Sequence, residues 1–308
     1  MKAVVYEKYG PPEVLKLTEI EKPKPKDDEV LVKIHAATVT SGDVRLRSSK
    51  FSPLFWLPAR LIFGLFRPKK KILGHELAGV VESTGKDVTR FGVGDAVFGT
   101  TTMLNTGSYA EYICLPESWK HGVVESKPVN LTFEEAAALP VGAMTAMYLL
   151  VKADVKRAEK VLVYGASGSV GSYALQLANK EGSSVTAVCS DSNFEMVESL
   201  GADNLIDYKV EDYSERNEKF DIVFDAVGKT SKAKAKKVLK ADGAFVSVKM
   251  LTKEKDEHLS RIRELAEQEK IQPYVDTYYY LDEIVEAHEY VDSGRKRGNV
   301  VIKIDDDE

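Results

Sequence analysis

A chain of 308 residues, 44% of them hydrophobic and 30% charged, can bury the cores of two ordinary globular domains. Its net charge of −5 excludes nonspecific nucleic-acid binding as a main function, because that function requires a basic surface. Its two cysteines, Cys114 and Cys189, cannot build a disulfide framework or a cysteine-rich zinc lobe.

The chain opens with MKAVVYE, a strand-like sequence without an apolar leader, so we expect a cytoplasmic protein. The longest apolar stretch, 51–66, contains Pro53, Pro58 and Arg60. These residues interrupt a stretch that is already short for a bilayer, so we expect no transmembrane segment.

The first half of the chain is rich in short β-like runs separated by turn residues, which predicts a compact β-barrel-like domain. Helical sequence starts at Leu131, where Thr132 and Glu135 have the spacing of a capping box. A domain boundary is therefore expected near residues 121–127. The strands of this half are predicted at 3–6, 14–18, 29–37, 76–83 and 96–99.

The second half is organised around a glycine turn. An apolar run at 161–164 is followed by glycines at every third position and then by helical spacing at 172–180. Ala166 stands where the stricter GxGxxG pattern has its first glycine, so the motif alone does not distinguish a phosphate-binding turn from an ordinary tight turn.

The segments that follow this turn strengthen the dinucleotide-binding interpretation. Strands alternate with helices, which predicts a doubly wound parallel sheet of the Rossmann type, with a dinucleotide across the carboxyl ends of its strands. The further strands are predicted at 184–188, 204–206, 220–224 and 244–248, and the helices at 193–200 and 231–240.

Motifs spread over nearly the whole chain resemble the medium-chain dehydrogenase/reductase superfamily, in particular its zinc-free quinone oxidoreductase branch. They include MKAVVYEKYGPPEVLKL, LGHELAGVVESTGKDVTRFGVGDAVFG, AAALPVGAMTAMYLL, YGASGSVGSYALQLA and GRKRGNVVIKI. The resemblance implies an α/β protein with a GroES-like β-barrel catalytic domain and a Rossmann-type domain. The expected division is 1–123 for the first part of the catalytic domain, 124–274 for the cofactor domain and 275–308 for the return to the catalytic domain.

The same resemblance implies that zinc is absent. Zinc-dependent relatives use a Cys, the His of a GHE motif and a further ligand, whereas this chain has Thr40 and Val141 at the flanking ligand positions. His75 alone cannot hold a tetrahedral ion. A site made of Asp43, His75 and Glu76 is the remaining alternative.

The cofactor is expected to be NADPH, with NADH as the alternative. After the second strand of the Rossmann unit, where NAD-binding domains place an acid, the chain has Ser190, which leaves room for a 2′-phosphate. Tyr208 matches a tyrosine that contacts this phosphate in similar enzymes. Asp191 argues against NADPH, because its charge would repel the phosphate if it pointed inward.

Each predicted cofactor residue also has a simpler interpretation as a turn or core residue. The full predicted set is Thr145, Gly165, Gly168, Ser169, Val170, Gly171, Ser190, Tyr208, Ala226, Val227, Gly228 and Asn299.

Without a metal, hydride must go to an acceptor whose developing negative charge is delocalised or hydrogen-bonded, as in a quinone or an α,β-unsaturated carbonyl. Thr40 and Asp43 are the predicted catalytic residues; Thr40 either donates a hydrogen bond to the substrate oxygen or only caps the backbone. Two alternatives stay open. One is a non-catalytic NADPH-binding sensor or partner protein, and the other is a zinc-independent alcohol or aldehyde reductase.

The apolar stretch 51–66 has three interpretations: core filling, a lid over an apolar substrate, or docking to a membrane surface helped by the basic run 67–71. The lid interpretation makes Phe55 and Trp56 substrate contacts. A homodimer is allowed, but residues 249–257 leave little room for the additional strand that pairs across the two-fold axis in relatives.

Overall fold

The computed structural model describes residues 1–51 and 53–304, with the side chains of residues 53–55 outside this description. The chain divides into two compact units: unit 1 comprises residues 1–140 and 275–308, and unit 2 comprises residues 141–274. Unit 1 extends beyond the expected limit at residue 123, because helix α3 (Phe133–Ala137) packs on strands β3, β4 and β5 of its sheet.

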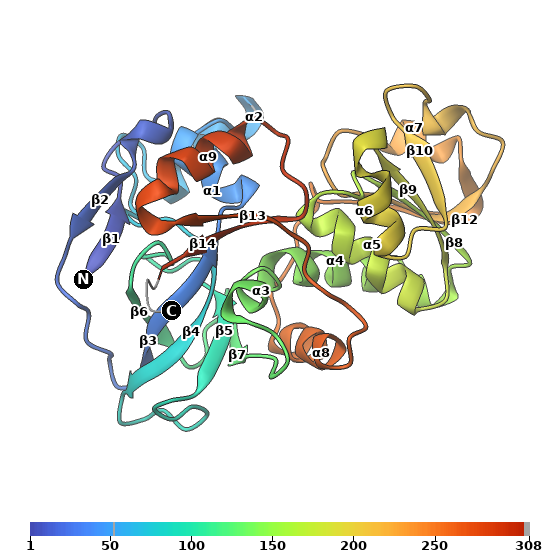
Figure 1. Cartoon of the computed structure of the whole chain (residues 1–308). Helices are drawn as coiled ribbons and strands as arrows, with labels where there is room; N and C mark the ends of the chain where they lie inside the picture. The colour runs from blue at the N-terminus through green and yellow to red at the C-terminus, as the bar shows by residue number, and fades with distance from the viewer. Residues whose placement is uncertain (52, 305–308) are drawn as a thin grey trace. The chain divides into compact units, whose positions relative to one another are not determined.

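Unit 1 is built on a largely antiparallel sheet of order β13-β14-β3-β4-β5-β7, in which β6 also pairs with β3 (Figure 1). The last strand of the chain pairs antiparallel with β3, so that Val301 lies opposite Thr38. A two-stranded sheet of β1 and β2 completes the unit. The strands are β1 (Lys2–Val5), β2 (Lys16–Glu19), β3 (Glu29–Thr38), β4 (Glu76–Thr84), β5 (Ala96–Thr100), β6 (Tyr112–Pro116), β7 (Val124–Ser126), β13 (Val275–Tyr280) and β14 (Asn299–Lys303).

The apolar alternation of these strands places their side chains in one core, which also receives the buried face of helix α9 (Ile284–Asp292). Buried polar residues lie beside this core: Asp43, Arg47 and His288 are at most 1% exposed. Arg47 forms an ion pair with Asp292 at the end of α9.

Two helices of unit 1 lie in segments for which the sequence indicated no helix. Helix α1 (Ser41–Ser48) begins at a capping box in which the Thr40 hydroxyl accepts from the Asp43 N–H and the Asp43 carboxylate accepts from the Thr40 N–H. Helix α2 (Pro53–Phe63) contains Pro58. The sequence of α1 carries only two aliphatic residues, Val44 and Leu46, so no apolar stripe marks it.

Unit 2 has a five-stranded parallel sheet of order β10-β9-β8-β11-β12, which confirms the doubly wound prediction. The order reverses between β8 and β11, the place where such sheets bind dinucleotides. The sheet ends at β12 within the described residues, with no further strand beyond it. The strands are β8 (Lys160–Tyr164), β9 (Ser184–Cys189), β10 (Asn204–Asp207), β11 (Phe220–Asp225) and β12 (Leu239–Ser247).

Among the helices of unit 2, α7 is shorter than the predicted 231–240. It ends at Lys236 because Leu239 already begins β12, and its lysines at positions 232 and 236 repel each other across one turn. The helices are α4 (Pro140–Lys152), α5 (Ser169–Lys180), α6 (Phe194–Ser199), α7 (Lys232–Lys236) and α8 (Asp256–Glu267). Both units also contain single 3₁₀ turns. Those of unit 1 are η1 (Pro12–Val14) and η5 (Leu281–Glu283), and those of unit 2 are η2 (Val155–Arg157), η3 (Asp191–Asn193) and η4 (Tyr213–Glu215).

Candidate active site

The turn after β8 is held open by a glycine in the left-handed region. Gly165 has a φ of +81°, which disfavours any larger residue, and its N–H donates to the carbonyl oxygen of Val188 at 2.8 Å. A Cβ at this position would also lie 2.5 Å from the side chain of Val227. The turns that follow β8 and β11 therefore lie against each other at the carboxyl edge of the sheet.

The other two glycines of the motif have different surroundings. A Cβ on Gly171 would overlap with the backbone of the turn at Gly165, so glycine here lets α5 pack closely against it. Among the described residues, a Cβ on Gly168 would meet only one backbone oxygen, at 3.6 Å, and that side of the turn is open. Ser169 and Val170 begin α5, whose first N–H groups have no partner within the helix and are suited to an anion.

Asp225, a residue the sequence reasoning overlooked, fixes the second turn of this edge. It is fully buried; its Oδ1 accepts from the N–H of Gly228 at 2.8 Å and its Oδ2 accepts from the Ser247 hydroxyl at 2.8 Å. The predicted residues Ala226 and Val227 therefore lie in a turn whose shape is set by a carboxylate. The signal was present in the sequence as an Asp at the carboxyl end of a strand.

A cluster of small polar side chains lies at the end of β9. The hydroxyls of Ser190 and Ser192 are 3.0 Å apart, and the Asn193 amide donates to Ser190 Oγ and to Ser167 Oγ, each at 3.1 Å. Since Ser167 belongs to the glycine turn, this cluster joins the predicted Ser190 to the predicted phosphate-binding turn.

The charge of Asp191, which argued against NADPH, is compensated. Asp191 Oδ1 lies 3.2 Å from the Nζ of Lys209, and both side chains are more than half exposed. Lys209 directly follows the predicted Tyr208, which is 54% exposed at the end of β10. The pair with Lys209 also lowers the pKa of Asp191. A cation that the sequence reasoning did not weigh therefore lies in the same region as Ser190.

Thr145 and Asn299 lie in different units. Thr145 is in α4, which packs on the start of α5: a Cβ on Gly142 would lie 2.5 Å from Ser169 Oγ. Asn299 is the first residue of β14, in unit 1.

In unit 1, the predicted catalytic residue Asp43 is the centre of a buried hydrogen-bond network. Its Oδ1 lies 2.7 Å from the Nδ1 of His75 and accepts from the N–H of Gly74 at 2.9 Å. Its Oδ2 accepts from the Thr40 hydroxyl at 2.6 Å. The Thr40 hydroxyl thus donates to a carboxylate, and it also accepts from the Asp43 N–H at 3.1 Å, as in the capping alternative. His75 contacts Asp43 through Nδ1, and Nε2 is its second ring nitrogen.

The network keeps Asp43 ionised. Burial alone would raise the pKa of this carboxyl, but the charge of His75 and the hydrogen bonds from His75 and Thr40 hold the pKa well below its usual range. A carboxylate that remains charged at all working pH values fixes the orientation of the imidazole ring.

These residues do not fit a zinc ion. Both oxygens of Asp43 are occupied by Thr40, Gly74 and His75, and the carboxylate of Glu76 accepts from the Thr38 hydroxyl instead of turning toward His75. Within residues 1–51 and 53–304 there is no group of three or more His, Cys, Asp or Glu side chains placed to hold a metal.

His75 lines a hollow of about 90 Å³ whose other walls are largely apolar. Two of its residues, Ile62 and Phe63, come from the end of α2, so the apolar stretch 51–66 does border the predicted catalytic residues. The lining residues are Tyr6, Leu46, Ile62, Phe63, Lys69, Lys70, His75, Met103, Leu104 and Asn105.

The core-filling interpretation of residues 51–66 is wrong for the outer part of α2, because Leu57 and Leu61 are 53% and 60% exposed. Of the two predicted substrate contacts, Trp56 is not among the described residues that line the hollow. Trp56 is 43% exposed and lies beside Arg60, and the side chain of Phe55 lies outside the described residues. Periodicity could not identify Ile62 and Phe63, because it does not reveal which helix face meets the hollow.

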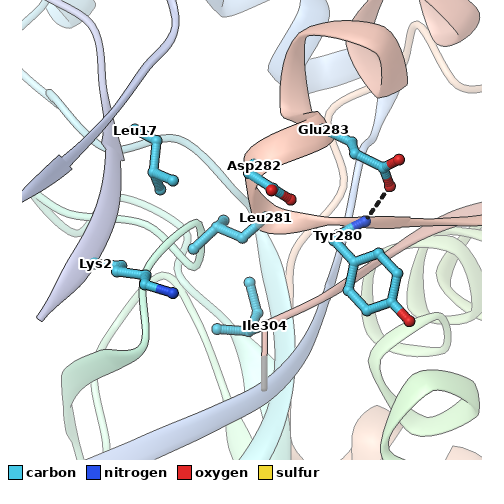
Figure 2. Close-up of a pocket in the computed structure, with 7 residues that line it drawn as sticks. All are labelled: Lys2, Leu17, Tyr280, Leu281, Asp282, Glu283 and Ile304. Carbon is cyan, nitrogen blue, oxygen red and sulfur yellow. Dashed lines mark hydrogen bonds between the residues drawn. The ribbon is translucent and has the colours of Figure 1, made fainter. Parts of the chain in front are cut away.

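A larger hollow of unit 1, about 490 Å³, contains none of the predicted site residues (Figure 2). Lys2, Leu17 and Ile304 line it together with residues 280–283, and the Glu283 carboxylate is used to cap the N–H of Tyr280 at 2.8 Å. Size alone therefore does not locate the active site.

His288 in α9 is a buried histidine outside the hollow. Neither ring nitrogen has a hydrogen-bond partner in the described part of the chain, and the ring packs edge-on against Tyr109 with centroids 5.7 Å apart. Burial lowers the pKa of His288 to about 4, and the nearby Arg47 adds to this effect, whereas Asp43 and Asp292 oppose it.

We expect His288 to make the protein less stable in acid. Between pH values of about 6.5 and 4 the unfolded chain binds a proton at this ring that the folded chain does not, so falling pH favours unfolding, by about 3 kcal/mol in total. Urea unfolding across this range should show a shallower pH dependence for His288→Leu. The exposed His121→Gln is the control. An unchanged slope in His288→Leu would refute this assignment.

Comparisons with known proteins agree with this architecture. A family model described as alcohol dehydrogenase GroES-like domain matches residues 26–126, and one described as zinc-binding dehydrogenase matches residues 169–277. The 2-methylene-furan-3-one reductase of Solanum lycopersicum is 35% identical, over 98% of this chain and 79% of the relative. The chloroplastic NADPH-dependent alkenal/one oxidoreductase of Arabidopsis thaliana is 32% identical over the same shares.

Among solved structures, the quinone oxidoreductase from Coxiella burnetii has a TM-score of 0.88 and 29% identity, covering 99% of each chain. The fold and these relatives define an oxidoreductase with a GroES-like and a Rossmann-type domain. The chain belongs to the medium-chain dehydrogenase/reductase superfamily. No described helix is long and apolar enough to cross a bilayer.

Proposed function

We propose that the protein is an NADPH-dependent reductase that transfers hydride to a quinone or to the C=C bond of an α,β-unsaturated carbonyl without a metal. The observation that carries the proposal is the Asp43–His75 pair beside an apolar hollow. His75 belongs to the GHE motif, which the resemblance identifies with a zinc ligand of zinc-dependent relatives. The relatives named above, which include an alkenal/one reductase and a quinone oxidoreductase, support the same substrate class.

The carboxyl edge of the unit 2 sheet is the proposed cofactor site. The open side at Gly168 and the start of α5 suit the pyrophosphate, and the turn held by Asp225 lies next to it. A bound NADPH supplies the hydride. The protein's task is to hold the acceptor carbon within about 3 to 3.5 Å of this hydride.

His75 is the proposed proton donor to the substrate oxygen. Hydride addition to an enone places negative charge on the carbonyl oxygen, and hydride addition to a quinone does the same. Asp43 orients the ring through Nδ1 and leaves Nε2 for this oxygen. Thr40 contributes indirectly, because its hydroxyl donates to Asp43. We therefore assign Thr40 and Asp43 to positioning.

The test of the proposal is an NADPH oxidation assay with simple quinones, short and long 2-alkenals, and the matching saturated aldehydes. We expect turnover of the quinones and alkenals and none of the saturated aldehydes. Turnover of the saturated aldehydes alone would favour the alcohol or aldehyde reductase. Tight NADPH binding with no turnover across the panel would favour the non-catalytic sensor or partner protein.

The cofactor preference is expected to depend on Lys209. Replacing it by Ala removes a cation beside Ser190 and Tyr208, so the Kd for NADPH should rise on the order of tenfold while the Kd for NADH stays constant. Asp191→Asn frees the lysine from its partner and should tighten NADPH binding. Fluorescence titration measures both values. Tighter wild-type binding of NADH than of NADPH would contradict the preference.

The purified protein is expected to contain no stoichiometric zinc and to keep its activity in the presence of a chelator. The reason is that Asp43 and His75 are hydrogen-bonded to each other instead of being available to a metal. Elemental analysis after dialysis checks this expectation, and about one zinc per chain would end it. The cytoplasmic location stays a prediction, as does the oligomeric state.

A further inference from the structure

Helix α2 exposes apolar side chains to solvent. Leu57, Leu61 and Ile62 are each more than half exposed, and Phe66, shortly after the helix, is 85% exposed. Leu65 between them is 38% exposed. We call these five residues the α2 face. Single exposed leucines are ordinary, but five along one helix and its continuation mark a surface that binds something apolar.

The only charged residue of α2, Arg60, contacts other parts of unit 1. The Arg60 guanidinium lies 3.9 Å from the centroid of the Tyr9 ring and donates to Ser49 Oγ at 3.1 Å. The Tyr9 hydroxyl in turn donates to the carbonyl oxygens of Phe63 and Gly64, at 3.0 and 2.8 Å. The helix is therefore anchored to unit 1 through its polar contacts and presents its leucines outward, the reverse of a normal surface helix.

A strong positive charge accompanies the α2 face. Residues 41–73 contain eight Lys or Arg and a single acid, Asp43, in a chain whose net charge is −5. Of the eight, Arg47 is buried and paired with Asp292, and the Lys71 Nζ lies 3.9 Å from the carboxylate of the exposed Glu7. Arg67, Lys69 and Lys71, immediately after Phe66, are exposed. The Lys69 Nζ donates to the Leu61 carbonyl oxygen at 3.1 Å, which holds this cation beside the leucines.

This combination selects among possible occupants. A second copy meeting the same face across a two-fold axis would oppose cations to cations. A nucleic acid would leave the leucines in water. A lid over the hollow of His75 uses Ile62 but leaves Leu57 and Phe66 without a role. An anionic bilayer surface suits both the apolar side chains and the cations, because the leucines can enter the interface while the lysines contact the headgroups.

We propose that the α2 face and the cations Arg67, Lys69 and Lys71 form a docking surface for anionic lipid bilayers. The proposal does not rest on the proposed function, because it concerns neither the cofactor nor the proton donor. Ile62 and Lys69 belong to this surface and also line the hollow of His75. Docking would bring the enzyme to the membrane surface, where a lipophilic substrate also lies.

Co-sedimentation of the full chain with vesicles tests this proposal. Phosphatidylcholine vesicles containing phosphatidylglycerol should bind the protein at least about tenfold more tightly than pure phosphatidylcholine, with the difference shrinking as salt rises. Trp56, at the border of the α2 face, should show a blue-shifted emission on binding, measured in a Trp119→Phe background.

The double variant Leu61→Glu, Phe66→Glu should lose vesicle binding, whereas Leu251→Glu, at a residue 93% exposed in unit 2, should bind as the wild type does. Circular dichroism melting and NADPH titration verify that each variant is folded. If the double variant is unfolded, the double variant Arg67→Glu, Lys71→Glu, at two exposed cations that do not line the hollow of His75, replaces it with the same expectation.

Three results would overturn the proposal. One is wild-type protein that does not bind anionic vesicles, and another is a folded double variant that binds them as tightly as the wild type. The third is light scattering that detects a dimer in the wild type but not in the double variant, without any lipid effect, since a second copy would then cover the face. Loss of vesicle binding with normal reductase activity on a water-soluble enone would separate docking from catalysis.

Discussion

Replacing His75 by Gln should lower kcat for an enone by about 10²-fold while leaving the Kd for NADPH unchanged. The substitution preserves a side chain able to hydrogen-bond to Asp43, at 2.7 Å in the wild type, but removes the group that delivers a proton to the substrate oxygen. The loss should therefore fall on kcat, and the pH dependence of kcat should flatten. Stopped-flow reduction followed through NADPH absorbance measures both.

The control is His121→Gln, at an exposed histidine of the same unit. Asp43→Asn gives a complementary result. Because the folded-state pKa of Asp43 is depressed, its charge contributes stability that is lost only as the pH falls through that low pKa, so it is fully present at neutral pH. Asp43→Asn should thus lower both kcat and the melting temperature at pH 7. A His75→Gln enzyme with wild-type kcat and pH profile would remove His75 from the mechanism.

The sequence predicted the parts of the fold whose determinants are local. The unit 2 strands and the turn at Gly165 are marked by apolar runs, and β8, β9, β10 and β11 were identified to within one residue. Strand β12 begins at Leu239, five residues before the predicted start at residue 244. Most strands of unit 1 were likewise predicted, with shifts of one or two residues at β1 and β2. Helix α1 was missed, because its stability comes from the capping box of Thr40 and Asp43 and from packing on α9.

The candidate site was harder to predict because it depends on contacts between distant positions. Asp43 and His75 are 32 residues apart, and only the fold shows that they share a hydrogen bond. The same holds for Asp191 and Lys209, whose pairing changes the argument about the 2′-phosphate. A sequence pattern identifies the residue types available at an edge or a turn, but it does not state which charges compensate each other.

Gly168→Ala should weaken NADPH binding by about tenfold or more without lowering the melting temperature, whereas Gly171→Ala should lower both. Gly168 has a φ of −84°, which alanine adopts freely, and its Cβ would make only an ordinary 3.6 Å contact with protein. The added methyl group would stand on the open side of the turn, where the pyrophosphate must approach the backbone. Any loss of binding is then a direct clash with the ligand.

At Gly171 the same methyl group would overlap with the backbone of the turn at Gly165 and lie 2.8 Å from the Cα of Ala166. Helix α5 would have to move away from the turn, at a cost of about 1 to 3 kcal/mol in the free energy of unfolding. Gly92→Ala, in unit 1, is the matched control, since its Cβ would meet only the Asp95 carboxylate, at 3.8 Å. Calorimetric melting and NADPH titration of the three variants separate the two effects. If Gly168→Ala bound NADPH as tightly as the wild type, the open side of this turn would not be the phosphate site, and the cofactor assignment in unit 2 would have to be rebuilt from the turn at Asp225.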